Sequence, residues 1–275
     1  MIFNKKFFFW VFLFLLVFLL SIFFWPIYKN LSFQPQVSFL NIGQGDATLL
    51  KLLNRQIILV DGGPDNLILR RLGEELPFYI KRIDFIFISH WHDDHIIGLI
   101  EVMRRFQVTA LLYASDLELS DLGEILLAEA RTQNIKIIPI DQSGIIKLNS
   151  NCEFYFLNPL RLNIKNNSNN SLIIKFVCSD KTFLLSGDNE KGVEEALIKS
   201  HLDFKADIFK ASHHGSKTSN QKHFLEKVAP EFLIISCGLN NKFNHPATEI
   251  IKNAQALNLK ILRTDQQGSI KFPLW

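Results

Sequence analysis

Cysteine is scarce in this chain. Its 275 residues include three cysteines, Cys152, Cys178 and Cys237, and they show no paired spacing. A framework of disulfide bonds is therefore not expected. The last two lie in apolar stretches that read as strands, so we expect all three to be buried free thiols.

A strong charge of either sign is also missing. The formal net charge is +3, while 48% of the residues are hydrophobic and 25 of them are phenylalanine. A charge so close to neutral does not by itself predict a nucleic-acid-binding surface. The length and the apolar content suit one domain with a sizeable core.

One long hydrophobic run stands near the N-terminus. Residues 7–24 are almost wholly apolar and uncharged, which is long enough for a membrane-spanning helix. The alternative is a cleaved signal peptide, whose apolar region is shorter and ends in small residues. Here bulky Phe23, Phe24 and Trp25 end the run. We therefore expect an anchor that is not cleaved.

The lysines around this run give its orientation. Lys5 and Lys6 precede it and only Lys29 follows closely, so the positive-inside bias places the start of the chain in the cytoplasm and the rest outside. The predicted organisation is a cytoplasmic N-terminus (1–6), a transmembrane anchor (7–27), a linker (28–36) and one domain (37–275).

Beyond the linker, strand-like runs come first and then alternate with helical segments, and this order occurs twice. Two such blocks predict an α/β (α+β) fold in which two sheets pack face to face with helices outside. The asparagine-rich stretch 163–170 is the one low-complexity segment and reads as a solvated loop.

The densest group of metal-binding side chains is the stretch 90–95, His-Trp-His-Asp-Asp-His, at the end of the apolar run 83–89. Imidazoles and carboxylates bind divalent metals. On an extended chain His90 and His92 point to the same side. Asp94 and His95 then begin a helical segment. This strand-to-helix turn predicts two adjacent metal positions rather than histidines that merely solvate a turn.

A weak internal repeat supports a shared site. Residues 84–90 and 207–213 both run from an aspartate through a mostly apolar strand and a serine to a histidine. Each is preceded by an aspartate that ends an apolar strand, Asp61 in one case and Asp188 in the other. We hypothesise two related half-domains, each of which delivers an aspartate and a histidine to one cleft.

These segments together resemble the metallo-β-lactamase fold superfamily, whose H-x-H-x-D-H signature is complete at residues 90–95. More closely, residues 37–275 are similar to the soluble C-terminal hydrolase domain of the ComEC family, the DNA-uptake channels of competent bacteria. This resemblance implies an αββα sandwich with its site along one edge of the sheets. The motifs that carry it are Phe39–Ala47 (FLNIGQGDA), Val60–Gly63 (VDGG), Ser186–Asp188 (SGD), Ser212–Ser219 (SHHGSKTS) and Arg263–Gly268 (RTDQQG).

The expected cofactors are one or two divalent ions, and Zn²⁺ and Mn²⁺ are the favoured ones. Such an ion lowers the pKa of bound water from 15.7 toward ~7 and so supplies hydroxide at neutral pH. Asp188 would bridge both ions, although a strand-end aspartate that caps the next helix is the alternative. A solvated loop is the alternative for His213. The expected metal ligands are His90, His92, Asp94, His95, Asp188 and His213.

The stretch 213–217 places imidazole, hydroxyl, ammonium and backbone N–H groups beside the metals, which suits a tetrahedral anion. Asp61 is expected to orient the histidine loop rather than to bind metal. For the other supporting residues an ordinary structural turn is an equal alternative. The expected catalytic residues are Asp94, His214, Ser216 and Lys217, and the expected supporting or substrate-binding residues are Asp46, Asp61, His245 and Asp265.

One departure from the superfamily concerns histidine. No histidine lies between His95 and His201, whereas β-lactamases and thioesterases of this superfamily typically supply a metal ligand from that interval. The corresponding stretch is 163–171. The first metal therefore has an amide in place of an imidazole, or borrows His245, and should bind more weakly. This gap argues against lactamase and glyoxalase chemistry.

The expected function is that of a membrane-anchored, metal-dependent phosphodiesterase that acts on DNA at the outer face of the cytoplasmic membrane, with a multi-span DNA-uptake channel as a partner. The alternative is a docking or binding module for such a channel, with a weak or vacant metal site. Hydrolysis of another ester or of a lactam is disfavoured by the missing histidine.

Overall fold

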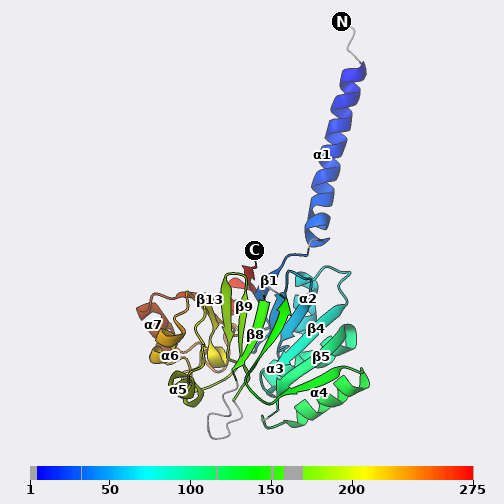
Figure 1. Ribbon diagram of the computed structural model, residues 1–275. Coiled ribbons are helices and arrows are strands. Elements are labelled where there is room, and N and C mark those ends of the chain that lie inside the picture. Colours follow the sequence, from blue (N-terminus) through cyan, green and yellow to red (C-terminus); the bar gives the residue numbers. More distant parts are fainter. Residues whose placement is uncertain (1–4, 32, 116, 150–151, 158–169, 275) are drawn as a thin grey trace.

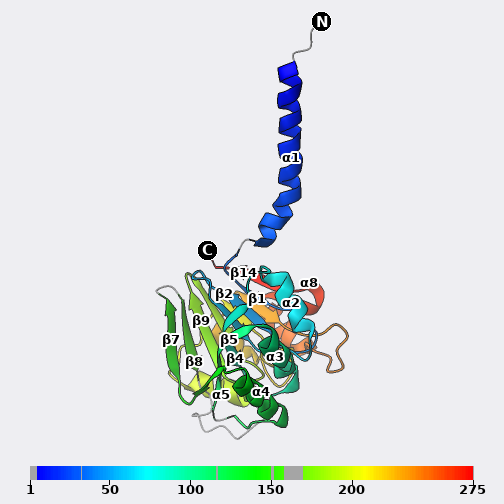
Figure 2. The ribbon, with the colours of Figure 1, turned by 90° about the vertical axis from the view of Figure 1, so that its right-hand side faces the viewer.

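A computed structural model describes the chain except for residues 1–4, 32, 116, 150–151, 158–169 and 275 (Figure 1). Its first element, helix α1 (Lys5–Leu31), projects away from the rest of the molecule (Figures 1 and 2). The segment Lys6–Phe24 is long and apolar enough to cross a membrane, and none of it is buried. It is a candidate span, and the predicted orientation across the membrane stays a prediction.

The remaining described residues form two seven-stranded sheets. The first has the order β14-β1-β2-β3-β4-β5-β6, and the second has the order β13-β12-β11-β10-β9-β8-β7. Strands of the first sheet are β1 (Gln36–Phe39), β2 (Thr48–Lys51), β3 (Ile57–Val60), β4 (Arg82–Ile88), β5 (Gln107–Ala114), β6 (Lys136–Ile140) and β14 (Ile270–Pro273). Those of the second are β7 (Gly144–Asn149), β8 (Cys152–Leu157), β9 (Ile173–Cys178), β10 (Lys181–Leu185), β11 (Ile208–Lys210), β12 (Phe232–Ile235) and β13 (Lys260–Arg263).

Helices cover the outer face of each sheet, so the predicted two-sheet α/β sandwich is confirmed (Figure 2). The first sheet carries α2 (Leu67–Glu75), α3 (Asp93–Arg105) and α4 (Asp121–Thr132). The second carries α5 (Lys191–Lys199), α6 (Lys222–Val228) and α7 (Thr248–Ala256), and the short α8 (Thr264–Gln267) links β13 to β14.

Strand periodicity explains how the layers assemble. In β4, Phe85 and Phe87 point between the two sheets, whereas Ile86 and Ile88 point toward the helices. This is the alternation that a strand buried on both faces requires. The phenylalanines fill the inter-sheet space, where the ring centroid of Phe87 lies 5.2 Å from that of Phe154. The high phenylalanine content is therefore partly the content of this core.

Strand direction separates two ends of the molecule. β1 and β3 are each antiparallel to β2, and β3 is parallel to β4. Hence β1 and β4 run in the same direction. Helix α1 leads into the start of β1, whereas the histidine cluster follows the end of β4 (Figure 1). We call these two sides of the first sheet the anchor end and the metal edge.

One prediction from the sequence is wrong. Cys152 and Cys178 form a disulfide bond, whereas only Cys237 is a buried free thiol as predicted. The two bonded cysteines are direct partners in the antiparallel register of β8 and β9. Sequence spacing did not reveal this pairing because strand register creates it. The predicted solvated loop, up to residue 169, lies outside the described residues.

Candidate metal centre

Metal-binding side chains from several strand ends converge at the metal edge. One set joins His90 and His92 to Asp188, and a second joins Asp94, His95 and His214 to the same aspartate; within each set the ligand atoms lie within 4.8 Å of one another. Asp188 thus belongs to both. The two sheets deliver these groups together, because β4 ends at Ile88, two residues before His90, and β10 ends at Leu185, three residues before Asp188.

The turn after β4 positions the first histidines. His92 occupies the N-cap position of α3 with an extended backbone, and the helix begins at Asp93. His90 and His92 therefore precede the helix, whereas Asp94 and His95 lie in its first turn. Carboxylates in a first turn are favoured by the positive end of the helix dipole. The predicted strand-to-helix turn is present.

Several ligand atoms at this point have no other partner. His90 Nε2, His95 Nε2 and Asp188 Oδ1 are buried and make no hydrogen bond within the described part of the chain. His95 Nε2 lies 3.3 Å from Asp188 Oδ1, and His90 Nε2 lies 3.8 Å from Asp188 Oδ2. Buried polar atoms are nearly always bonded. Their convergence here, with nitrogen and oxygen donors, fits a divalent cation.

The second set contains His214, where the internal repeat pointed to His213. His214 Nε2 lies 3.1 Å from Asp94 Oδ2 and 3.7 Å from Asp188 Oδ2. His213 approaches Asp188 only to 3.8 Å, is partly exposed, and has Glu190 on its other side. His214, predicted as a catalytic group, therefore also lies among the candidate ligands, and the ligand role of His213 stays a prediction.

The backbone of these two histidines is left-handed. His213 and His214 both have positive φ, at 50° and 54°. Left-handed backbone costs roughly 1–2 kcal/mol for a residue with a side chain, and such strain concentrates at functional sites. The alternation of an extended strand does not continue through this turn, so counting along a strand does not decide which of the two rings would hold the metal.

A carboxylate behind the ligands orients one of them. Asp61 Oδ2 lies 2.9 Å from His95 Nδ1, and its Oδ1 accepts the backbone N–H of Ser89 at 2.8 Å. Partners of this kind fix the ring of a metal-binding histidine and leave its other nitrogen for the ion. Asp61 and Asp46 form a third cluster with His95, but on this rear side of its ring.

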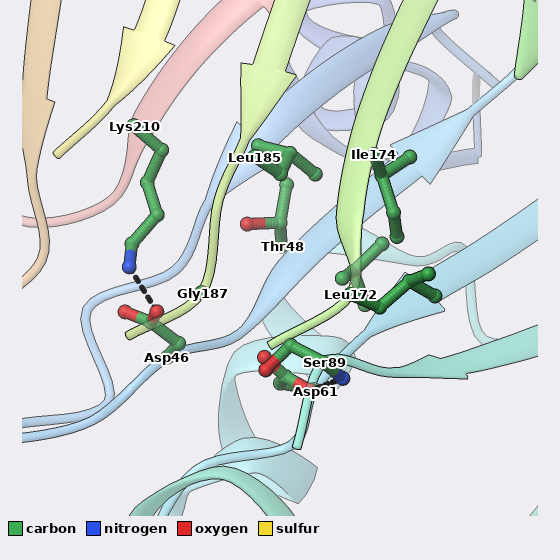
Figure 3. Close-up of a pocket in the computed structure, with 10 residues that line it drawn as sticks. Asp46, Thr48, Asp61, Ser89, Leu172, Ile174, Leu185, Gly187 and Lys210 are labelled. Carbon is green, nitrogen blue, oxygen red and sulfur yellow. Dashed lines mark hydrogen bonds and ion pairs between the residues drawn. The ribbon is translucent and has the colours of Figure 1, made fainter. Parts of the chain in front are cut away.

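Asp46 is held by a lysine that the sequence did not single out. Lys210, on β11, forms an ion pair with Asp46, and both are buried (Figure 3). Asp46 Oδ1 also lies 3.3 Å from His214 Nδ1. Burial alone would raise the pKa of Asp46, but Lys210 and His214 outweigh it and hold that pKa well below its usual range. Asp46 is therefore a charged partner of His214.

A small cavity lies beside this ion pair, between the two sheets. It measures about 10 Å³, roughly the space for one water molecule. Asp46, Asp61 and Ser89 line its polar side, while Leu172 and Leu185 contribute to the apolar side (Figure 3). The ligands are thus backed by packed residues from both sheets.

Neighbouring charges set the protonation of the ligands. Burial, assisted by His95, lowers the pKa of His90. Burial acts in the same direction on His214, yet Asp188 and Asp46 overcome it and raise the pKa of His214 to about 9. Without a cation, His214 therefore keeps its protons on both ring nitrogens, next to the ionised carboxylates of Asp46 and Asp188. Binding of a divalent ion would displace those protons.

The remaining predicted residues lie at different distances from the ligands. Ser216 is buried and accepts the backbone N–H of Thr218, so its hydroxyl shapes the turn. Lys217 is exposed. The ring of His245 lies 6.3 Å from that of His214, next to the second set rather than to the first. Asp265 is paired with Arg263 and belongs to neither set.

The stretch that replaces the missing histidine is described only at its end. Asn170 is buried and lines one cavity together with His90 and His92. From the sequence we expect an amide in place of a histidine beside the first metal. Among the described residues, the side-chain amide of Asn170 is the candidate for that role. His245 is less well placed for that role because it neighbours His213 and His214.

A two-sheet sandwich with such an edge defines a class of metallohydrolase folds, and comparison with known families agrees. The family described as the metallo-beta-lactamase superfamily matches residues 40–238. The chain belongs to this superfamily. Its fold and its cluster of histidines and aspartates support a metal-dependent hydrolase that uses a divalent ion.

Among curated proteins, the relatives are competence proteins. The chain is 28% identical over 263 residues to ComE operon protein 3 of Bacillus subtilis, covering 90% of this chain and 34% of that protein. It is 28% identical over 243 residues to competence protein ComA of Neisseria gonorrhoeae, covering 88% and 32%. The resemblance to ComEC-type proteins is thus confirmed, and the chain spans about a third of the length of these relatives.

Solved structures extend the likeness of fold. The metallo-beta-lactamase fold protein YhfI from Bacillus subtilis has a TM-score of 0.61 at 12% identity, covering 86% of this chain and all of that one. The metallo hydrolase Igni18 from Ignicoccus hospitalis has a TM-score of 0.58 at 13% identity, covering 87% of this chain and 100% of that one. At such low identity the likeness is one of fold alone.

Proposed function

We propose that this chain is a metal-dependent phosphodiesterase that cleaves DNA. The observation that carries the proposal is the sharing of Asp188 by two sets of ligands whose buried atoms have no other partner. Two adjacent cations are the arrangement that many phosphoesterases use for attacking and leaving oxygens. The competence relatives favour DNA as the substrate.

In the proposed reaction, the ions when bound supply hydroxide and polarise the phosphoryl oxygen. The chain contributes orientation and charge. Asp61 and Asp46 fix the rings of His95 and His214 from behind. Lys217 is exposed on the turn that carries His214, where an ammonium can approach a phosphate from solvent. Ser216 holds that turn in shape.

The proposed location is the outer face of the cytoplasmic membrane. Disulfide bonds persist in oxidising compartments and are rare in the cytosol, so the bond between Cys152 and Cys178 agrees with an external domain. The lysines before residue 7 favour the same orientation for α1. The competence relatives favour a multi-span DNA-uptake channel as the proposed partner.

The test uses the full chain, purified in detergent and loaded with Zn²⁺ or Mn²⁺. We expect it to hydrolyse bis-p-nitrophenyl phosphate and to cut DNA, and we expect His92→Ala to lower both rates to background. The matched control is His223→Ala, since His223 is exposed on α6 and should be neutral. Retention of both activities by His92→Ala would remove the metal mechanism.

The alternative function is a docking module for the channel with a weakly occupied metal site. It is favoured by the first set, in which His90, His92 and Asp188 are the only histidine, cysteine or carboxylate ligands among the described residues. Metal content separates the two proposals. A purified chain that holds less than one ion in an excess of Zn²⁺ or Mn²⁺, and cuts no phosphodiester, would be a docking module.

A further inference from the structure

A cavity opens directly beside the first set of ligands. It has a volume of about 270 Å³, and His90 and His92 form part of its wall. Ligand pockets for drug-sized molecules span roughly 300–1,000 Å³. The cavity is therefore sized for one small ring system. Its lining residues are His90, Trp91, His92, Leu117, Glu118, Leu119, Ser120 and Asn170.

The wall away from the histidines is largely apolar. Leu117 and Leu119 come from the segment between β5 and α4, and the side chain of Leu119 is 37% exposed. Trp91 is held in place by Tyr113, whose ring centroid lies 5.0 Å away. Ser120 ties this segment to the metal turn, because its hydroxyl donates to the carbonyl of Trp91 at 2.8 Å.

Two polar groups in this wall have no partner. Trp91 Nε1 and Asn170 Nδ2 are buried and make no hydrogen bond within the described residues, although both residues are more than nine-tenths buried. An unsatisfied buried donor costs about 1–3 kcal/mol. Both nitrogens are enclosed by protein and closed to solvent, so the surface that the cavity offers to a ligand is mainly apolar.

We propose that this cavity binds the nucleobase next to the scissile phosphate. A base offers flat apolar faces, which match the leucines of the wall. Proteins hold unstacked bases against such surfaces. The proposal rests on the proposed function, since the histidines of the same wall would hold the ion that contacts the phosphate.

The cavity implies that the substrate enters as a single strand or with its base unstacked. A base inside a duplex cannot enter a lateral pocket without leaving its stack.

The experiment measures binding separately from cleavage. Thymidine 5′-phosphate and deoxyribose 5-phosphate carry the same phosphate, but only the first has a base. Isothermal titration of the full metal-loaded chain in detergent should give a Kd at least about tenfold lower for thymidine 5′-phosphate, the range expected for one base stacked in a site. Equal Kd values would overturn the proposal.

Variants connect that difference to the cavity. Leu117→Ala and Leu119→Ala each remove part of the apolar wall, so each should reduce the ratio of the two Kd values about threefold or more. Ile125→Ala is the matched control, because Ile125 is 58% exposed on α4 and does not line the cavity. An unchanged ratio in both wall variants would place the base elsewhere.

The two proposals can fail independently. If the chain binds thymidine 5′-phosphate through this wall but cuts no phosphodiester, the proposed base-binding cavity is supported and the proposed phosphodiesterase function is rejected. If the chain cuts DNA and an oligonucleotide of abasic sites at equal rates, and has equal Kd values for the two monophosphates, the phosphodiesterase function is supported and the base-binding cavity is rejected.

Discussion

The anchor end and the metal edge both carry aspartates, yet these aspartates do different work. At the anchor end Asp84 accepts the backbone N–H of Ile57 at 2.8 Å, and Asp207 accepts that of Thr182 at 2.8 Å. Each completes the hydrogen bonding at the start of a strand. At the metal edge, Asp188 keeps a buried oxygen without a hydrogen bond.

The difference teaches how to separate structural carboxylates from functional ones. The internal repeat contains aspartates of both kinds, so a motif alone does not distinguish them. Asp84 has its backbone partner and a neighbouring Arg82 that is well exposed. The carboxylates at the metal edge instead share histidines whose nitrogens remain open. The metal site is distinguished by buried ligand atoms that lack a hydrogen-bond partner, and not by residue type alone.

The largest expected effect on the metal edge is that of substituting Asp188. Asp188→Asn removes the shared negative charge, so we expect the bound metal to fall for both ions and phosphodiesterase activity to drop by several orders of magnitude, because hydroxide formation depends on the ion. Asp180→Asn, at the other end of β10, is the control and is 81% exposed. Elemental analysis and initial rates provide the measurement, and full metal content in Asp188→Asn would contradict the assignment.

The ion pair behind the metal edge should have the next largest effect. Lys210→Met leaves the buried Asp46 carboxylate without its cation, which typically costs 3–5 kcal/mol. Denaturant unfolding of the full chain in detergent would measure the loss. Adding Asp46→Asn should recover most of it. A loss below about 1 kcal/mol would mean that water reaches Asp46 and replaces the lysine.

A matched pair of substitutions then compares the two ends directly. Asp61→Asn keeps an oxygen for the Ser89 N–H but removes the charge beside His95. Loss of such a partner lowers metal affinity by about 10–100-fold. Asp84→Asn should leave the affinity unchanged. Competition with a metal chelator measures both, and equal affinities for the two variants would remove the distinction between the ends.

The smallest expected effect concerns pH. Glu194 on α5 accepts the backbone N–H groups of Asn220 and Gln221 and so holds the end of the turn that carries His214. Burial raises the pKa of Glu194 to about 7, against the lowering effect of those two bonds. The folded chain therefore binds a proton that the unfolded chain has released. Stability present at low pH is lost as the pH rises through 7.

From pH 6 to pH 8 this loss amounts to about 1 kcal/mol. Glu194→Gln keeps one of the two acceptor oxygens and removes the titration, so its unfolding free energy should fall less over that interval. Parallel unfolding curves for the two proteins at pH 6 and pH 8 give the difference. An identical pH dependence would mean that Glu194 stays ionised in the folded chain.

Much of this architecture could be predicted because its signals are local. Apolar runs in the sequence predict the buried strands. The metal-binding side chains of His90, His92, Asp94 and His95 lie within six residues. The missed features depend on backbone conformation or register. The positive φ of His213 and His214 brings both rings within 3.8 Å of Asp188, and strand pairing joins Cys152 to Cys178.

Lys210 was missed for a related reason. A single lysine in an apolar strand looks like an interruption, and its partner Asp46 lies in a loop of the other sheet. Asn170 ends a polar stretch in which no one asparagine stands out. Such residues acquire meaning only from what lies opposite them in space.

The length of β4 has a consequence for where the chemistry takes place. At ~3.3 Å per residue, its seven residues carry the chain roughly 20 Å from the side where α1 joins. In the proposed orientation, with α1 in the bilayer, the ions would stand well clear of the lipid headgroups. A strand of nucleic acid would then meet them in open solvent, before it reaches the surface of the membrane.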